Sequence, residues 1–371
     1  MSKLLHITPN VYPKLEVEHA TKQIWKELSK DYEEYHIVGR SDDQHFHTEK
    51  EGKLYLHRVP KLGGNKSFLF TSFLMIYYLR KYKIDAMLSQ CAVLGGIAGV
   101  LYGRIFRIPI MIEIHDTIYF DILDGGSFVK RLNARILKRT YQSADLIRVL
   151  NPLMKEMLEA RIGAAKIVVI ENRVNFSIFN KPKESYSVND PINIISVGTF
   201  TKRKGYADAI KVMNRVRKRY NVHLTLIGGG DEKEHYIQLA HGEDWLTLID
   251  FISQSELKEL ICKSDIYIQT SYREGMPRTI LEAMALGMPI ITSDAGVTAG
   301  SVEHKKDAMM FPAGDFNTFE KYLILLIQND HLREELGKHA LIEAKKRFAW
   351  NTNFLQYRIA LRDMKKTSES N

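Results

Sequence analysis

Cysteine is scarce in this sequence: only Cys91 and Cys262 occur among 371 residues. Two thiols exclude a disulfide framework and a zinc site built from thiolates, and they suit a reducing compartment. Residues 1–10, MSKLLHITPN, have too short an apolar run and no small-residue cleavage site for a secretory signal peptide. We therefore expect a cytoplasmic protein.

Long hydrophobic runs are also missing. The charge-free run 86–103 is 18 residues long but contains Ser89, Gln90 and four glycines, whereas a membrane span needs about 20 predominantly apolar residues. The apolar stretch 67–79 is too short to cross a bilayer, although it is long enough for an interfacial helix. We expect a chain that is soluble or lies on a membrane surface.

The composition is otherwise ordinary, with 45% hydrophobic and 26% charged residues, which excludes a disordered, collagen-like or coiled-coil protein. The formal charge of +9 is uneven. Residues 1–181 carry 27 Lys and Arg against 19 Asp and Glu, and residues 182–371 carry 26 against 25. The basic first half predicts an acidic partner, which can be a nucleic acid, an anionic bilayer or a phosphorylated substrate.

Short apolar runs alternate with helical patterns along the whole chain. This alternation predicts an α/β protein with parallel strands covered by helices. A polar segment at 180–191 contains Pro182 and Pro191 and predicts a linker, after which the alternation restarts. We expect two doubly wound domains, at 1–181 and 190–351, with one more amphipathic helix at about 352–371.

The most informative stretch is 272–294, YREGMPRTILEAMALGMPIITSD. Pro277 suits the first position of a helix, and Gly287 suits its C-terminal stop. The start of this helix, at residues 276–279, would offer backbone amides to phosphate oxygens.

Two carboxylates flank this predicted anion site: Glu274 precedes the helix, and Glu282 lies in its second turn. Carboxylates repel a diphosphate unless they accept hydrogen bonds from sugar hydroxyls, so the pattern fits a nucleotide sugar. Glu282 would bind the ribose diol and Glu274 a hydroxyl of the transferred sugar. The alternative is a capped surface helix with two solvated glutamates.

The stretch 272–294 resembles the donor-site motif of the retaining glycosyltransferases of family 4, which have the GT-B fold. The resemblance extends over nearly the whole chain through further stretches in the family's order: ADLIRVLN (144–151), KIVVIENRVNFSIF (166–179), VGTFTKRKGY (197–206), LIGGGDE (226–232) and FPAGD (311–315). It implies two Rossmann-like domains facing across a cleft. The first domain, completed by the C-terminal helix, would bind the acceptor and the second the nucleotide-sugar donor.

The resemblance also implies the donor-binding residues. Lys204 is the expected diphosphate lysine; Thr199 stands where the family has an arginine, and Lys202 or Arg203 is expected to share that role. From the residues alone, this basic loop follows a strand, where open α/β folds bind ligands, or is a solvated charge run. The full expected donor set is Gly198, Thr199, Lys202, Arg203, Lys204, Phe251, Ile252, Glu274, Gly275, Met276, Pro277, Thr279, Ile280 and Glu282.

The expected catalytic residues are His115, Glu274 and Lys204. His115 follows a buried strand in PIMIEIHDT, where the family has a residue that contacts the transferred sugar; a structural histidine is the alternative. Lys14, Glu16 and Asp116 are expected to bind the acceptor. Lys14 and Glu16 lie in a loop where relatives often have two glycines, and Asp116 can instead cap the following segment.

These expectations predict a retaining transferase that moves a sugar from a UDP- or GDP-sugar to a hydroxyl of a glycan or lipid-linked glycan, in bacterial surface polysaccharide synthesis. The sequence has no evident Asp-x-Asp chelate, so we expect no metal and no other cofactor. A non-catalytic nucleotide-sugar-binding protein is the first alternative. A nucleic-acid-binding protein is the second, although no RNA- or DNA-binding module is present.

A basic helix is predicted at 128–143, where five cations alternate with apolar residues. Such a face attracts anionic lipids by about 1 kcal/mol per cation near the surface. Together with 67–79 it predicts peripheral contact with the inner face of the cell membrane, near a lipid-linked acceptor. A merely solvated face is the alternative.

Overall fold

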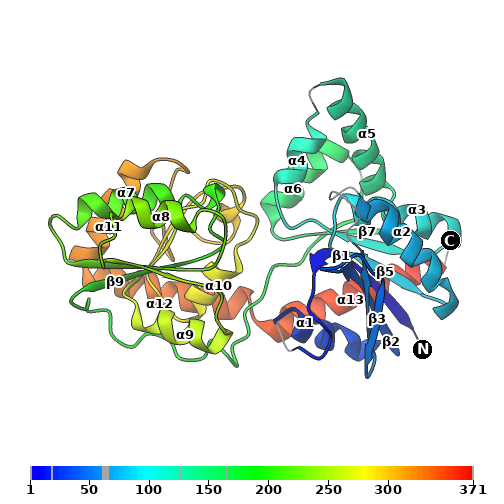
Figure 1. Cartoon of the computed structure of the whole chain (residues 1–371), viewed down its shortest axis with the longest axis horizontal. Coiled ribbons are helices and arrows are strands. Elements are labelled where there is room, and N and C mark those ends of the chain that lie inside the picture. Colours follow the sequence, from blue (N-terminus) through cyan, green and yellow to red (C-terminus); the bar gives the residue numbers. More distant parts are fainter. Residues whose placement is uncertain (1, 18–19, 61–66, 126, 164, 370–371) are drawn as a thin grey trace. The chain divides into compact units, whose positions relative to one another are not determined.

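The computed structural model describes residues 2–17, 20–60, 67–125, 127–163 and 165–369. Contacts divide the chain into two units, one formed by Met1–Ile170 with Phe354–Asn371 and the other by Glu171–Asn353. Each unit is an α/β unit around its own sheet (Figure 1).

The segment that the sequence predicted as a linker packs on the second unit. The backbone amide of Lys183 donates to the Leu286 carbonyl at 2.8 Å, and the Tyr186 hydroxyl donates to the Gly287 carbonyl at 2.9 Å. Asn189 donates to the Asp265 carboxylate at 2.8 Å. The division between the units therefore comes after Ile170.

The first unit has an eight-stranded sheet in the order β3-β4-β2-β1-β5-β6-β7-β8. Its strands are parallel except for β3, which pairs antiparallel with β4. The sheet is doubly wound, because the chain moves outward from β1 in one direction and then from β5 in the other. The strands are β1 (Lys3–Val11), β2 (Glu34–Arg40), β3 (His47–Glu51), β4 (Leu54–Val59), β5 (Ala86–Ser89), β6 (Ile110–Glu113), β7 (Leu146–Val149) and β8 (Ile167–Val169).

Helices cover this sheet, and the last helix of the chain packs with them from Phe354 onward. α3 approaches the sheet closely because it carries glycines: a Cβ at Gly99 would lie 2.4 Å from Ile110 Cδ1. The helices are α1 (Ala20–Leu28), α2 (Ser67–Leu79), α3 (Leu94–Phe106), α4 (Ile118–Leu123), α5 (Phe128–Gln142), α6 (Pro152–Ile162) and α13 (Trp350–Glu369), with single turns at Ser29–Asp31 and Arg80–Tyr82.

The second unit has a six-stranded, fully parallel sheet in the order β11-β10-β9-β12-β13-β14. The strands are β9 (Ile192–Val197), β10 (Val222–Ile227), β11 (Leu246–Ile249), β12 (Ile266–Gln269), β13 (Ile290–Ser293) and β14 (Met309–Phe311). The helices are α7 (Tyr206–Val216), α8 (Lys233–Leu239), α9 (Gln254–Lys263), α10 (Arg278–Ala285), α11 (Phe316–Gln328) and α12 (Asp330–Arg347), with single turns at Lys202–Lys204 and Thr298–Gly300. The direction of winding reverses between β9 and β12, and open α/β sheets bind ligands outside the carboxyl ends of strands at such a point.

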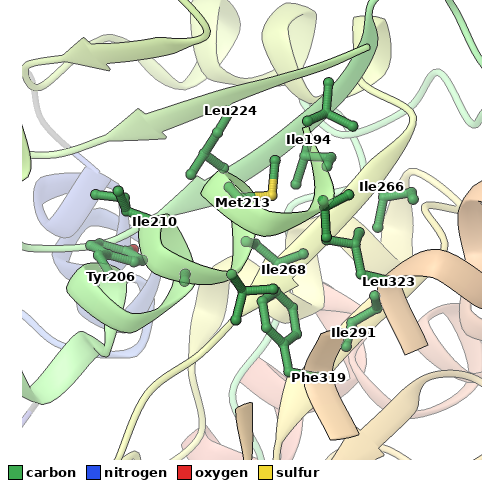
Figure 2. Packing of buried hydrophobic residues seen from close by; sticks show 14 of the residues in the cluster. Ile194, Tyr206, Ile210, Met213, Leu224, Ile266, Ile268, Ile291, Phe319 and Leu323 are labelled. Carbon is green, nitrogen blue, oxygen red and sulfur yellow. The ribbon is translucent and has the colours of Figure 1, made fainter. Parts of the chain in front are cut away.

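A continuous apolar core holds α7 and α11 against this sheet (Figure 2). Ile194 and Ile266 come from the two strands at the reversal, and Met213 and Leu323 come from the helices; all four are fully buried. Burying one such side chain contributes about 1.5–3 kcal/mol. The core therefore holds β9 and β12 against the helices that cover them, although each strand is short.

None of the described helices is both long enough and apolar enough to cross a membrane.

Candidate functional site

The carboxyl ends of β9 and β12 carry the two loops in which the sequence placed the donor site. Gly198 directly follows β9, and Lys204 lies in the single turn before α7. Gln269 ends β12, and Glu274 lies in the loop between β12 and α10. Because β9 and β12 are hydrogen-bonded neighbours, both loops leave the sheet at the same edge.

Lys204 and Glu274 form an ion pair between these two loops. The Lys204 Nζ atom lies 2.6 Å from Glu274 Oε1, and the two residues are only 8% and 6% exposed. Ser271 Oγ and Gln269 Nε2 donate to the same oxygen at 2.6 Å and 3.1 Å. Within the part of the chain that the structure describes, Glu274 Oε2 has no hydrogen-bond donor, so this oxygen is available to a ligand.

Glycine is required where the two loops meet. Gly205 has a φ of +68°, and a Cβ there would lie 2.1 Å from the Thr270 carbonyl oxygen. Thr270 in turn donates its hydroxyl to the Lys204 carbonyl at 3.0 Å. At Gly198, a Cβ would lie 3.0 Å from Lys204 Cε. The absence of a side chain at these glycines lets the lysine cross the end of β9 and reach Glu274.

Helix α10 begins beside this ion pair at Arg278. Pro277 occupies the N-cap, one position earlier than predicted, because its ψ of 117° is extended. The predicted stop is confirmed, since Gly287 has a φ of +66° just after the helix. Asn172 Nδ2 donates to the Met276 carbonyl at 2.9 Å, and first-turn amides have no partner within a helix. The structure thus places the start of α10 beside the Lys204–Glu274 pair, and the binding of an anion by its first amides stays a prediction.

Glu282 lies half-buried in α10. Burial raises the pKa of its carboxyl to about 7, and the nearby Arg278 guanidinium opposes this only in part. The hydroxyl of the fully buried Tyr267 lies near both glutamates. Burial raises the pKa of this hydroxyl, and the negative charges of Glu282 and Glu274 raise it further. Glu282 is therefore not a solvated surface glutamate.

The other predicted donor residues differ in exposure. Thr199, Lys202 and Arg203 are exposed beside Lys204, whereas the Ile280 side chain is fully buried in the core. Ile280 can therefore reach a ligand only through its backbone. The Thr279 hydroxyl donates to the Val197 carbonyl at 3.4 Å.

Phe251 and Ile252 lie in the loop after β11. Phe251 is 78% exposed, and it packs over Gly229, where a Cβ would lie 2.9 Å from the ring. Ile252 lines an open pocket of about 500 Å³ together with Ser255 and Leu260. The Phe251 ring is thus largely exposed at the edge of the sheet, with one part of it against the glycine loop after β10.

In the first unit, His115 is held by a buried carboxylate. His115 Nε2 lies 2.9 Å from Glu113 Oε2, and the imidazole is 36% exposed. Arg148 Nη1 and the Tyr357 hydroxyl donate to Glu113 Oε1 at 2.7 Å and 2.5 Å. Burial alone would raise the pKa of Glu113, but Arg148 and His115 outweigh burial and hold this pKa well below its usual value. Glu113 therefore stays ionised and orients the imidazole.

Lys14 and Glu16, two of the predicted acceptor residues, line a pocket of about 990 Å³ in the first unit with Arg58 and residues of β3. Leu15 between them is buried, and its amide donates to Glu49 Oε2 at 2.6 Å. A side-chain carboxylate thus fixes the loop that contains Lys14 and Glu16.

Asp116 does not line the pocket of Lys14 and Glu16. Its Oδ1 accepts from the Ile118 amide at 3.0 Å, at the start of α4. Asp116 thus binds the first backbone amide of α4, although Thr117 is the N-cap of that helix. Its contact with the acceptor stays a prediction.

Sequence reasoning missed Gln269 and Ser271, which bind Glu274, and Glu113, which binds His115. The signal was present, because all three are polar residues at the carboxyl end of a buried parallel strand. In the described part of the chain, no three His, Cys, Asp or Glu side chains gather closely enough to hold a metal ion.

Comparison with known families covers both units. Residues 17–177 match the family described as Glycosyltransferase Family 4, and residues 177–342 match the family described as glycosyl transferases group 1. This chain belongs to the group 1 and family 4 glycosyltransferases. The resemblance seen in the sequence is therefore confirmed.

Curated relatives of this glycosyltransferase are distant. The amylovoran biosynthesis glycosyltransferase AmsK of Erwinia amylovora is 24% identical over 292 residues, which is 76% of this chain and 70% of AmsK. The capsular polysaccharide biosynthesis glycosyltransferase CapM of Staphylococcus aureus is 24% identical over 273 residues, which is 69% of this chain and 70% of CapM.

Solved structures show the fold. Sucrose-phosphate synthase of Thermosynechococcus elongatus matches with a TM-score of 0.83 at 18% identity, over 98% of this chain and 99% of the synthase. Anabaena HepE in complex with UDP-glucose matches with a TM-score of 0.76 at 16% identity, over 98% of this chain and all of HepE. The predicted GT-B fold, with two parallel α/β sheets, is confirmed.

We expect Lys204→Met to lower the free energy of unfolding by about 3 kcal/mol, because it leaves the buried Glu274 carboxylate without its cation. The double variant Lys204→Met/Glu274→Gln should regain at least half of that loss. Urea unfolding of both variants measures this. Lys211→Met is the matched control, because it breaks an exposed ion pair with Asp208 and should cost less than about 1 kcal/mol. Equal losses for the buried and exposed pairs would contradict the prediction.

We expect Glu282→Gln to remove a pH dependence of stability. The pKa of folded Glu282 is about 7 and that of an unfolded glutamate is about 4.3, so the folded state holds the extra proton between these values. Raising the pH from 5 to 8 then lowers the free energy of unfolding of the native protein by about 3 kcal/mol. The variant Glu282→Gln lacks this loss because its side chain does not ionise. Urea unfolding at pH 5 and pH 8 tests this, and an identical pH dependence in both proteins would refute it.

Proposed function

We propose that this glycosyltransferase moves a sugar from a nucleoside diphosphate sugar to a hydroxyl of a glycan or lipid-linked glycan, with retention of anomeric configuration. The observation that carries the proposal is the buried pair of Lys204 and Glu274. A cation and a carboxylate lie together at the carboxyl ends of β9 and β12, beside the start of α10. A donor with a diphosphate and a hydroxyl-bearing sugar fits both charges.

In this proposal the diphosphate binds Lys204 and the first amides of α10. Both attract the negative charge of the diphosphate: the lysine with its ammonium group, and the helix with its free N–H groups. The exposed Lys202 and Arg203 add positive charge at the same loop. Charge that develops on the leaving diphosphate is thus stabilised by groups already in place.

The two glutamates bind hydroxyl groups. Glu274 Oε1 is taken by three donors, so Oε2 accepts from a hydroxyl of the transferred sugar. Glu282, half-buried at the next turn of α10, accepts from the ribose. The exposed Phe251 ring offers an apolar face to the base.

The transfer breaks the bond between the anomeric carbon and the diphosphate oxygen, and it forms a bond from that carbon to the acceptor oxygen. The acceptor attacks on the side from which the diphosphate leaves, and its proton passes to the departing phosphate oxygen. His115, oriented by Glu113, contacts the transferred sugar and does not act as a base. No step in this scheme needs a metal ion.

The relatives support the finer assignment of donor and pathway. HepE is described in complex with UDP-glucose, and AmsK and CapM are described as biosynthesis enzymes of amylovoran and capsular polysaccharide. We therefore propose a UDP- or GDP-sugar as donor and a growing surface polysaccharide as product. This assignment places the reaction in the cytoplasm, at the inner face of the cell membrane.

A panel of UDP- and GDP-sugars, scored by thermal shift and by slow donor hydrolysis, tests the donor site. A donor present at 100 times its Kd should stabilise the protein by about 2.7 kcal/mol. We expect one donor to respond and Glu282→Ala to abolish the response. Glu234→Ala, at an exposed position of α8, is the control and should respond as the native protein does. No response to any donor would overturn the proposal.

His115→Ala should lower donor hydrolysis about 100-fold, the effect of losing one group that stabilises a transition state. The thermal shift with the donor should change little, because Lys204, Glu274 and Glu282 keep the contacts proposed for the diphosphate and the hydroxyls. His331→Ala is the control, since that side chain is 80% exposed on α12. Unchanged hydrolysis in His115→Ala would assign this histidine a structural role only.

A further inference from the structure

Three neighbouring helices of the first unit, α2, α3 and α5, expose large apolar side chains to solvent. Phe70 on α2, Ile105 on α3 and Val129 on α5 are 63%, 62% and 65% exposed. These exposed fractions are far larger than those of core residues. Seven more large apolar side chains of the same three helices are also exposed. Contiguous apolar patches of this kind mark interaction surfaces in soluble proteins.

The exposed residues lie in one region of the first unit, because α3 contacts both α2 and α5. The rings of Tyr77 on α2 and Phe106 on α3 lie 6.5 Å apart. Arg104 Nη2 on α3 donates to the Ser143 hydroxyl at the end of α5 at 2.6 Å. In Figure 1, α2 and α3 lie side by side in the first unit. We call the exposed faces of α2, α3 and α5 the three-helix surface.

Helix α5 carries two apolar stripes. Leu137 and Tyr141 are buried against the first unit, whereas Leu132 and Ile136 are 50% and 42% exposed. The exposed pair follows Val129 at helical spacing, so these residues share one face. The packing of α5 on the first unit uses the buried stripe alone. The exposed stripe must therefore serve another purpose.

Cations border the exposed stripe of α5. Arg131, Arg135 and Arg139 are exposed at intervals of four residues, in the row next to Leu132 and Ile136. Among the described residues, none of these arginines has an acidic partner within ion-pair distance. Their positive charges are therefore available to a negatively charged partner that binds the apolar stripe.

The same combination of ring and cation occurs at the end of α2. The Arg80 guanidinium lies 4.4 Å from the centre of the Tyr77 ring, and Lys81 Nζ lies 4.0 Å from that of Tyr78. The two tyrosines are 45% and 57% exposed. Tyrosine rings with a polar tip and long cationic side chains are typical of the interface between membrane and water.

We propose that the three-helix surface docks on an anionic phospholipid bilayer. Its apolar side chains enter the region between headgroups and acyl chains, and its arginines and lysines contact the lipid phosphates. A bilayer is favoured over a protein partner because cations accompany the apolar residues both on α5 and in the single turn after α2, and among the described residues no ion pair joins these cations to a carboxylate. The inference rests on the proposed function in one respect, because docking brings the enzyme to a lipid-linked acceptor.

Vesicle sedimentation with the full chain tests the docking. The native protein should bind vesicles of phosphatidylcholine with phosphatidylglycerol, and it should bind vesicles of phosphatidylcholine alone much more weakly. Binding should weaken strongly at about 1 M salt, where the screening length falls to about 3 Å. Failure to bind the anionic vesicles, or equal binding to both kinds, would overturn the proposal.

Paired variants separate the contributions of charge and apolar contact. Arg131→Ala/Arg135→Ala should lower the affinity for anionic vesicles about 30-fold, at about 1 kcal/mol per cation. Leu132→Ser/Ile136→Ser should lower it at least as much. The controls are Lys218→Ala/Lys345→Ala and Ile342→Ser, which change exposed residues of the second unit and should bind as the native protein does. Equal losses in the controls would contradict the proposed surface.

Two further measurements keep this inference separate from the proposed function. The donor-induced thermal shift should be unchanged in the surface variants, so loss of docking with an intact donor response would leave the donor site in place. Light scattering over a range of concentrations shows whether the native chain self-associates. Self-association that Leu132→Ser/Ile136→Ser abolishes, without vesicle binding, would replace the bilayer by a second copy of this chain.

Discussion

The ion pair between Lys204 and Glu274 is the constraint on which the donor side of the structure depends. A lysine and a glutamate that are both about nine-tenths buried are stable only together, because either charge alone would face a large desolvation cost. The pair joins the loop after β9 to the loop after β12. It thereby holds the cation and the carboxylate of the proposed site in place before any ligand arrives.

The first unit repeats this arrangement with different residues. Glu113, at the end of β6, is buried with Arg148 from β7 and Tyr357 from α13, and it orients His115. In both units a buried carboxylate near the carboxyl end of a parallel strand holds another charged or polar group in place: the buried Lys204 in the second unit and the partly exposed His115 in the first. The common reason is geometric: parallel strands end at one edge of a sheet, so polar residues that follow them converge.

The strand pattern of the parallel sheets could be predicted from the sequence, because buried parallel strands are continuous apolar runs. Strand β3 was missed, since its sequence HTEKE is polar and it lies at the edge of the sheet. Helix α12 was missed because its buried face includes Arg333 and Gly337 in place of an apolar stripe. The glycine stop of the donor motif could be predicted from the local geometry of a helix end. The glutamates and the basic loop were singled out because the stretches that contain them resemble the family.

The sequence by itself determined the family, the fold and the position of the donor motif, since these depend on local order along the chain. Only the tertiary structure decided that Lys204 pairs with Glu274, 70 residues apart, and that Ile280 faces the core. It also decided that Asp116 binds the first amide of α4 and that α2, α3 and α5 each leave large apolar side chains exposed. These features depend on which segments the two sheets bring together and on how deeply each side chain is buried.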